Sequence, residues 1–187
     1  MRRALTPLAL AALVALAGCG GGSASGGVPS RAQARKDLAG APGPLASLHA
    51  QANKILGGGA RAFEARLAAL KGHGVVVNKW ASWCAPCRYE FPVLERVSVK
   101  LGKRVAFLGV DFADQTSAAR RYLKAHPLSY PSFADTDKKI ADVMRSGAGA
   151  PITNFYAPSG KLVFQHAGPY RSDKALEADV RRYVLGS

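Results

Sequence analysis

The chain has 187 residues, of which 48% are hydrophobic, and this is enough for one globular domain with a sizeable core. Its formal net charge is +14, from 26 basic and 12 acidic residues. The basic residues are scattered instead of being clustered with aromatic residues, so no nucleic-acid partner is indicated. A solvated basic surface or attraction to an anionic membrane is favoured instead.

The N-terminal residues predict an export signal that ends in a lipidation site. Residues 1–3 are basic, and the apolar run Leu5 to Ala17 is too short to span a membrane but fits the core of a signal peptide. Residues 16–19 read Leu-Ala-Gly-Cys, which resembles a bacterial lipobox with cleavage before Cys19 and lipidation of its thiol. An ordinary secretory signal that contains a cysteine is the alternative. We therefore expect residues 1–18 to be a lipoprotein signal peptide.

A tether and a helical lead-in are expected next. Residues 19–44 are rich in Gly, Ala, Ser and Pro, a composition typical of a flexible linker. Residues 45–187 then form the expected folded domain. Apolar residues at helical spacing predict a first helix over 45–56, stopped by three glycines, and a second helix over 60–71.

The centre of the domain is a strand followed by two cysteines. The run Val75 to Val77 has the composition of a strand buried on both faces, and a helix is expected from about Cys84. Cys84 and Cys87 have C-x-x-C spacing, which is typical of a redox site beside a βαβ pattern. A helix N-terminus favours the thiolate, which is the attacking species, so we expect Cys84 to be the nucleophile. Cys87 lies on the same helix face and could resolve the mixed disulfide.

Two neighbours complete this expected site. Pro86 falls in the first helical turn, where a missing N–H does no harm, and Trp83 offers an apolar wall for a docking partner. An inert structural disulfide and half of a zinc site are the alternatives. The disulfide would close too small a loop to stabilise much, and the four histidines form no H-x-H or H-x-x-x-H pair. With Cys19 lipidated, only two thiols are left, and an exported location suits disulfide chemistry.

The remaining elements alternate. The helix after the cysteines continues through Leu101 and contains Pro92, which predicts a kink. Further elements are expected as a strand over 104–111, a helix from Asp114 or Thr116 to His126, a strand over 132–134, a helix from Asp135 or Thr136 through Met144, a hairpin of strands over 151–156 and 161–166, and a helix over 172–185. This order predicts an α/β fold with a parallel sheet core and an antiparallel edge.

From about residue 60 onward, the sequence resembles the TlpA/ResA-type membrane-anchored, thioredoxin-like thiol:disulfide oxidoreductases. The resemblance rests on the W-C-x-P-C motif with Pro92 beyond it and on Gly149-Ala150-Pro151-Ile152-Thr153, which is similar to the family's G-x-P-T-T. It implies a thioredoxin-like three-layer sandwich, in which a central mixed sheet is flanked by helices. It also implies that Pro151 is cis and packs against the disulfide, while the Ala150 backbone is presented to an extended partner peptide. An ordinary strand-starting proline is the alternative.

Three polar positions bear on this resemblance. Glu90 matches the family's C-x-x-C-[KR]-x-E-x-P pattern, which implies a place near the disulfide and a role in proton transfer; an acid that merely stabilises the helix start is the alternative. Asn78 stands where thioredoxin has a buried aspartate and cannot titrate, which leaves Glu90 or water as the proton acceptor for Cys87. Lys79 departs from the family's large apolar residue, and a buried lysine is costly unless its ammonium is paired or reaches water.

The resemblance implies a lipid-anchored, extracytoplasmic thiol:disulfide oxidoreductase without cofactor or metal. Expected partners are exported cysteine-containing proteins, with apocytochromes c as candidates for a reductant in cytochrome c maturation, and a membrane electron donor or acceptor. A thiol peroxidase is one alternative, disfavoured because its P-x-x-x-T-x-x-C setting is absent. The other is a copper chaperone that binds through Cys84, Cys87 and His166, although chaperones on this fold use C-x-x-x-C.

Overall fold

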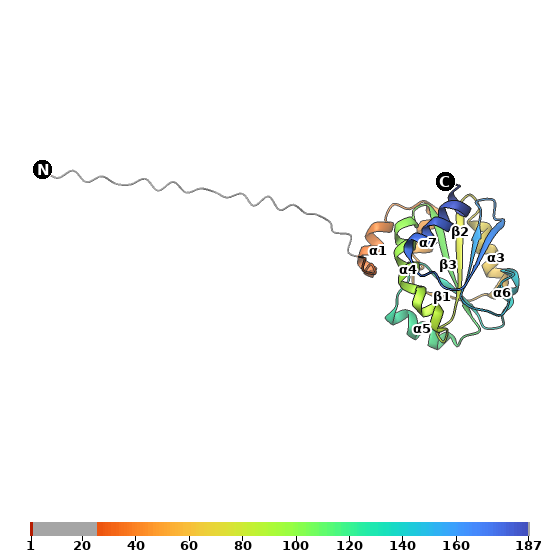
Figure 1. Ribbon diagram of the computed structural model, residues 1–187. Helices are drawn as coiled ribbons and strands as arrows, with labels where there is room; N and C mark the ends of the chain where they lie inside the picture. Colours follow the sequence, from red (N-terminus) through yellow and green to blue (C-terminus); the bar gives the residue numbers. More distant parts are fainter. Residues whose placement is uncertain (2–25, 187) are drawn as a thin grey trace.

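The computed structural model describes Met1 and residues 26–186, which fold around one six-stranded sheet in the order β1-β4-β3-β2-β5-β6 (Figure 1). The strands are β1 (Ile55–Leu56), β2 (Gly74–Trp80), β3 (Val105–Phe112), β4 (Ser132–Asp135), β5 (Ile152–Tyr156) and β6 (Leu162–Ala167). Strands β1 to β4 run parallel, β5 is antiparallel to β2, and β6 is antiparallel to β5. This is the expected parallel core with an antiparallel hairpin at its edge.

Helices cover both faces of the sheet (Figure 1). One layer consists of α4 (Ala85–Leu101), α5 (Thr116–Ala125), α7 (Asp173–Asp179) and its π-helical continuation η1 (Val180–Leu185). The opposite layer consists of α2 (Gly43–His49), α3 (Gly59–Ala69) and α6 (Lys139–Val143). Successive strand residues point to opposite faces of the sheet. In β2, Val76 therefore packs in the apolar cluster under the α4 layer, and Val75 and Val77 pack in the cluster under the α3 layer. The expected three layers and the apolar run buried on both faces are therefore present.

The expected helix over 45–56 is wrong in its second half. Helix α2 ends at His49, and Ile55 and Leu56 instead pair with β4 as a parallel edge strand. Asn53 redirects the chain: it has a φ of 63°, and its side chain donates to the Leu123 carbonyl at 3.2 Å and accepts from the Leu128 N–H at 3.0 Å. These contacts with a distant segment end the helical pattern.

The flexible tether expected over residues 19–44 includes a helix and is therefore shorter than expected. Helix α1 (Arg31–Leu38) lies within it and packs against α4. The side chain of Ser30 accepts a hydrogen bond of 3.2 Å from the Gln33 N–H, which caps the helix, and Ala34 and Leu38 are buried. These two residues, spaced by four positions, form an apolar face that the general composition obscures. The flexible-linker expectation is therefore wrong for residues 31–38.

Two helix starts differ from their expected caps. Helix α5 is preceded by Gln115, which forms no side-chain cap, while Asp114 accepts from the Ser82 N–H at 2.5 Å. Helix α6 begins only at Lys139, yet Asp135 still accepts from the N–H groups of Ile140 and Ala141, at 2.8 and 2.9 Å. Asp135 therefore satisfies N–H groups in the first turn of α6 from four residues before the helix, whereas the Asp114 carboxylate stabilises the turn after β2.

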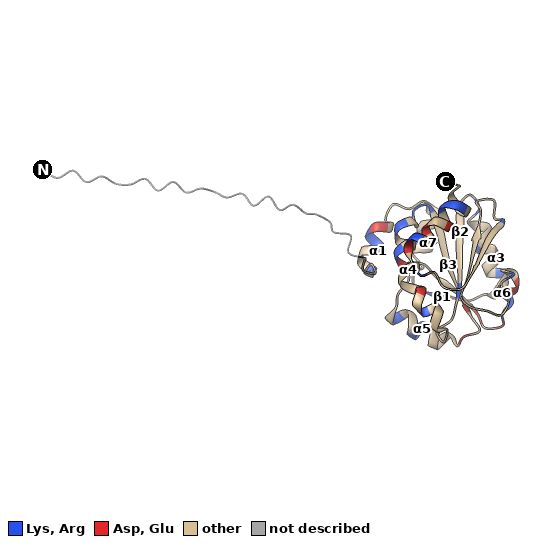
Figure 2. Cartoon of the chain, in the orientation of Figure 1, with Lys and Arg blue, Asp and Glu red and all other residues tan. Residues whose placement is uncertain are grey.

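The expected signal peptide and Cys19 lie outside the described residues, apart from Met1. Within residues 26–186, none of the helices has the length and apolar character that crossing a membrane requires. Lys and Arg occur on helices of both layers, in keeping with their scatter along the sequence (Figure 2).

Candidate redox site

The two cysteines lie where β2 gives way to α4, and they form a disulfide. Cys84 is the N-cap of α4, and its sulfur accepts a hydrogen bond of 3.2 Å from the Cys87 N–H. Cys84 is 4% exposed and Cys87 is fully buried. After reduction, a thiolate at Cys84 would meet the N–H groups and the positive end of the α4 dipole, as expected from the sequence.

Residues with exposed apolar side chains adjoin the two cysteines in the chain. Trp83 is 59% exposed and donates from Nε1 to the Ala113 carbonyl at 3.2 Å, while Pro86 is exposed in the first turn of α4. Tyr89 is 62% exposed on the same helix and was not singled out from the sequence, although an aromatic residue outside the apolar stripe is a usable signal. The segment around Cys84 thus offers a surface on which a partner could rest.

The Ala150–Pro151 segment also approaches the disulfide. The peptide bond between these residues is cis, as the resemblance implies. The Ala150 carbonyl oxygen lies 3.6 Å from Sγ of Cys84, and Pro151 is buried directly before β5. The fold therefore brings together two motifs that are 66 residues apart in the chain.

Glu90 is fully buried on α4, one helical turn beyond Cys87. Its Oε1 accepts from Nδ2 of Asn78 at 2.8 Å, and its Oε2 accepts from the Tyr170 N–H at 3.0 Å. Burial raises the pKa of Glu90 to about 7, although both hydrogen bonds act to lower it. A carboxyl with this pKa exists in both protonation states near neutral pH and can take up and return a proton.

Neither hydrogen-bond partner of the Glu90 carboxyl was predicted as such from the sequence. Asn78 also donates from Nδ2 to Oγ1 of Thr153 at 3.1 Å, which links the Glu90 pair to β5. Tyr170 contributes a backbone N–H, so its residue type gives no sequence signal for this role. No hydrogen bond joins the Glu90 carboxyl to either cysteine within the described residues.

Two further acids, Asp111 and Asp114, lie close to each other near the loop that precedes Cys84, and neither was predicted from the sequence to be near the site. Asp114 accepts from the N–H groups of Ser82 and Gln115, which fixes the turn after β2. Asp111 is fully buried, and within residues 26–186 neither of its carboxyl oxygens has a hydrogen-bond partner. Burial, with the nearby charge of Asp114 as the next cause, raises the pKa of Asp111 to about 8. Asp111 is therefore largely protonated at neutral pH.

The structure does not bring His166 into a metal site with the cysteines. Its ring stacks on Tyr170 with the ring centroids 4.1 Å apart. Across the part of the chain that the structure describes, no group of three or more His, Cys, Asp or Glu residues is arranged to hold a metal ion. The copper-chaperone alternative thus lacks a ligand set in this part of the chain.

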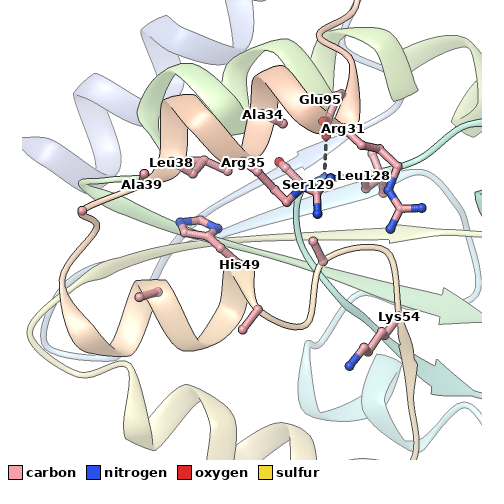
Figure 3. Close-up of a pocket in the computed structure, with 14 residues that line it drawn as sticks. Arg31, Ala34, Arg35, Leu38, Ala39, His49, Lys54, Glu95, Leu128 and Ser129 are labelled. Carbon is pink, nitrogen blue, oxygen red and sulfur yellow. Dashed lines mark hydrogen bonds between the residues drawn. The ribbon is translucent and has the colours of Figure 1, made fainter.

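A pocket of about 500 Å³ lies between α1, α2 and the buried Glu95 of α4 (Figure 3). Its lining includes the basic Arg31, Arg35 and Lys54, and Oε2 of Glu95 accepts from the Ser129 N–H at 2.7 Å. Burial raises the pKa of Glu95 to about 7. The pocket contains none of the residues around the disulfide, so it is separate from the redox site.

Comparisons with known proteins agree with this geometry. A family model described as the AhpC/TSA family matches residues 51–165, a span that contains both cysteines and Pro151. The thiol-disulfide oxidoreductase ResA of Bacillus subtilis (strain 168) is 31% identical over 98 residues, which cover 52% of this chain and 54% of ResA. The thiol:disulfide interchange protein DsbE homolog of Paracoccus denitrificans (strain Pd 1222) is 37% identical over 95 residues, which cover 50% of each chain. The chain thus spans about half the length of the curated relatives it matches.

A similar fold occurs among solved structures. The crystal structure of a thiol:disulfide interchange protein of the thioredoxin family from Chlorobium tepidum TLS matches with a TM-score of 0.56 and 26% identity, over 62% of this chain and 83% of that chain. The expected thioredoxin-like fold is therefore confirmed. The resemblance to ResA-type oxidoreductases is likewise confirmed by the names of the sequence relatives.

Proposed function

Because the chain belongs to the AhpC/TSA family and its curated relatives are thiol:disulfide oxidoreductases, we propose that it exchanges disulfides with exported proteins through Cys84 and Cys87. The observation that carries this proposal is the Cys84–Cys87 disulfide at the start of α4, with the Ala150 carbonyl oxygen 3.6 Å from Sγ of Cys84. This geometry combines a thiolate-stabilising helix end with backbone that an extended peptide can approach.

In the reducing direction, the Cys84 thiolate attacks one sulfur of a partner disulfide. A mixed disulfide forms, and the partner's other sulfur leaves as a thiolate and takes up a proton. Cys87 then gives its proton to Glu90 or water and attacks Sγ of Cys84, which releases the second partner thiolate. Two electrons pass to the partner, and the chain is left with the Cys84–Cys87 disulfide. Disulfide formation in the partner is the reverse sequence.

The positions of the residues around the disulfide suggest a role for each of them. Trp83 and Pro86 are exposed beside Cys84 and would support a docked partner. Ala150 and Pro151 would align an extended partner segment with the disulfide. Glu90 would accept the Cys87 proton, since burial raises its pKa to about 7.

We further propose that the protein acts outside the cytoplasm and is attached to the membrane through Cys19. The basic start, the apolar run and the Leu-Ala-Gly-Cys sequence support this location. Exported proteins with cysteine pairs, apocytochromes c among them, are the proposed substrates, and a membrane protein is the proposed electron donor or acceptor. Expression of the full chain and of Cys19→Ser, followed by fractionation, tests the anchor: only the variant should leave the membrane fraction.

The direct test of the redox proposal is the equilibrium reduction potential of the Cys84–Cys87 pair, read by Trp fluorescence or thiol alkylation in redox buffers. A value near thioredoxin's, about −270 mV, indicates a reductant, whereas a value near about −120 mV indicates a protein that makes disulfides. A Cys84→Ser, Cys87→Ser double variant is the control for signals unrelated to the pair. The proposal is wrong if the pair neither reduces reversibly nor exchanges with insulin or a model disulfide.

A further inference from the structure

Lys79 is a fully buried lysine in β2, the strand that leads to Cys84. It follows Asn78, so its side chain lies on the opposite face of the sheet from the Asn78–Glu90 pair. Moving an ammonium group out of water is strongly unfavourable unless other groups compensate for the lost hydration. The contacts of its Nζ therefore require a physical explanation.

The compensation comes from backbone carbonyls. Nζ donates to the carbonyl oxygens of Ser146 at 3.0 Å and Gly147 at 2.6 Å, and it lies 4.5 Å from the centroid of the Phe112 ring. Among residues 26–186, no salt bridge involves Lys79. The charge of Asp135 acts on it, but the Asp135 carboxylate accepts hydrogen bonds from the start of α6. The ammonium is thus held by two consecutive peptide carbonyls.

The Ser146 and Gly147 carbonyls lie at the start of the segment that leads to Ala150. Residues 147–149 read Gly-Ala-Gly and are exposed, a composition with little intrinsic rigidity. Within the described residues, the hydrogen bond from Lys79 to the Gly147 carbonyl is the one made to the backbone of residues 147–149. Pro151 is buried at the other end, and the Ala150 carbonyl lies beside Sγ of Cys84. The segment is therefore held at its start by Lys79 and at its end by the sheet.

We propose that Lys79 is a positioning residue for partner recognition: it fixes the start of the 147–149 segment so that the Ala150 backbone stays aligned with a partner peptide at Cys84. This inference rests on the proposed disulfide exchange. Lys79 lies on the far side of β2 from Glu90 and makes no hydrogen bond to either sulfur among the described residues. It therefore affects the recognition of an extended protein substrate and leaves the chemistry of the disulfide itself unchanged.

The test compares Lys79→Met with wild type, because methionine keeps most of the side-chain length but cannot donate to the two carbonyls. Reduced protein is mixed with insulin, as a protein disulfide, and with bis(2-hydroxyethyl) disulfide, as a small one. We expect the second-order rate constant with insulin to fall about tenfold or more, since small misplacements of binding groups have effects of this size. The rate constant with the small disulfide should stay within about twofold of wild type, and the reduction potential should not change. Lys161→Met, on the exposed β5–β6 turn, is the matched control.

Equal losses with both disulfides, or no loss with insulin, would overturn the inference. A double-mutant cycle with Ala148→Gly adds a test of mechanism: if both changes act by loosening the same segment, their effects on the insulin rate are less than additive. If Lys79→Met does not fold, Lys79→Leu, which also lacks a donor, takes its place in the same cycle.

Backbone NMR order parameters separate this inference from the proposed function. Those of residues 147–150 should be lower in Lys79→Met than in wild type, whether or not the protein reacts with insulin. Unchanged order parameters there refute the role of Lys79 even if the protein is an oxidoreductase. If wild type reacts with neither disulfide but the segment loosens, the proposed function fails and the anchoring by Lys79 stands.

Discussion

Nδ2 of Asn78 donates a 2.8 Å hydrogen bond to Oε1 of Glu90, and both side chains are buried. The amide cannot titrate, so a proton that moves in this pair must be carried by the carboxyl. Burial raises the pKa of Glu90 to about 7, while the hydrogen bonds from Tyr170 and Asn78 act in the opposite direction. Asn78 therefore supports the carboxylate and leaves Glu90 as the group that changes charge near neutral pH.

Glu90→Gln removes this titration. The wild-type rate of disulfide exchange should change through an inflection near pH 7, and the variant should lack that inflection, with its largest rate loss above pH 7, where the wild-type carboxyl is ionised. Stopped-flow fluorescence with insulin between pH 5 and 9 measures both profiles. Glu64→Gln, on the exposed face of α3, is the control and should match wild type. Superimposable profiles for the Glu90 variant and wild type would remove Glu90 from proton transfer.

Asn78→Asp places a second carboxyl within hydrogen-bond distance of Glu90. Two carboxyls this close cannot easily both ionise, so one of the pair should keep its proton to a pH above 7. We expect the inflection in the exchange rate to move to higher pH and the protein to lose stability in alkaline buffer. The pH profile and urea unfolding at pH 6 and 9 measure these effects, and an inflection that stays in place contradicts the expected coupling.

Removing each cysteine separately should reveal the order of the two steps. In Cys87→Ser, the remaining Cys84 thiol can attack a disulfide but has no internal partner to release it. The mixed disulfide should therefore accumulate to about one equivalent per chain. In Cys84→Ser, the buried Cys87 should react much more slowly. Mass spectrometry after reaction with 5,5′-dithiobis(2-nitrobenzoate) counts the adducts, and faster trapping at Cys87 would reverse the assigned roles.

The buried acids predict that the oxidised protein is more stable in mild acid than at pH 8. Burial raises the pKa of Glu90 and of Glu95 from 4.5 to about 7, and it raises that of Asp111 from 3.8 to about 8. Between the ordinary and the raised values, the folded state binds more protons than the unfolded state. The free energy of unfolding therefore falls as pH rises through this window, by about 1.4 kcal/mol per pH unit for each fully unbalanced proton.

Urea unfolding at pH 5 and pH 8 measures this difference. We expect a loss of a few kcal/mol at the higher pH, and Glu95→Gln should make the loss smaller by removing one of the three groups. Lys79 has the opposite effect on the free energy of unfolding, and only above about pH 8, because burial lowers its pKa from 10.5 to about 8. Its folded state then binds fewer protons between these values, so this group adds stability as pH rises from 8. Equal stability at pH 5 and 8 contradicts the carboxyl prediction.

Leu38→Ala tests whether α1 belongs to the folded domain. Leu38 is buried against the end of α4, where it approaches Gly102. Truncation should lower the free energy of unfolding by about 2–4 kcal/mol, as for other large-to-small core changes. Urea unfolding measures the loss, and Val28→Ala, at an exposed position before α1, is the control. A loss below 0.5 kcal/mol would mean that α1 adds little to the stability of the fold.

Those parts of the protein that depend on short-range patterns could be predicted from the amino-acid sequence. Three features can each be recognised within a few residues: the β-branched run of β2, the cysteine pair at the start of α4 and the Ala150–Pro151 motif. This is possible because strand and helix periods and cap positions are local properties. The parallel core with its antiparallel hairpin followed from the order of these elements.

The contacts that tune the site, in contrast, arise only when distant parts of the chain pack together. The N–H that reaches Glu90 belongs to Tyr170, 80 residues away, and the carbonyls that hold Lys79 lie 67 and 68 residues away. Pairing with β4 likewise converted Ile55 and Leu56 from an expected helix end into a strand. Backbone donors and acceptors are the same in nearly every residue type, so their pairing across the fold leaves no mark in the sequence and is set only when the layers pack together.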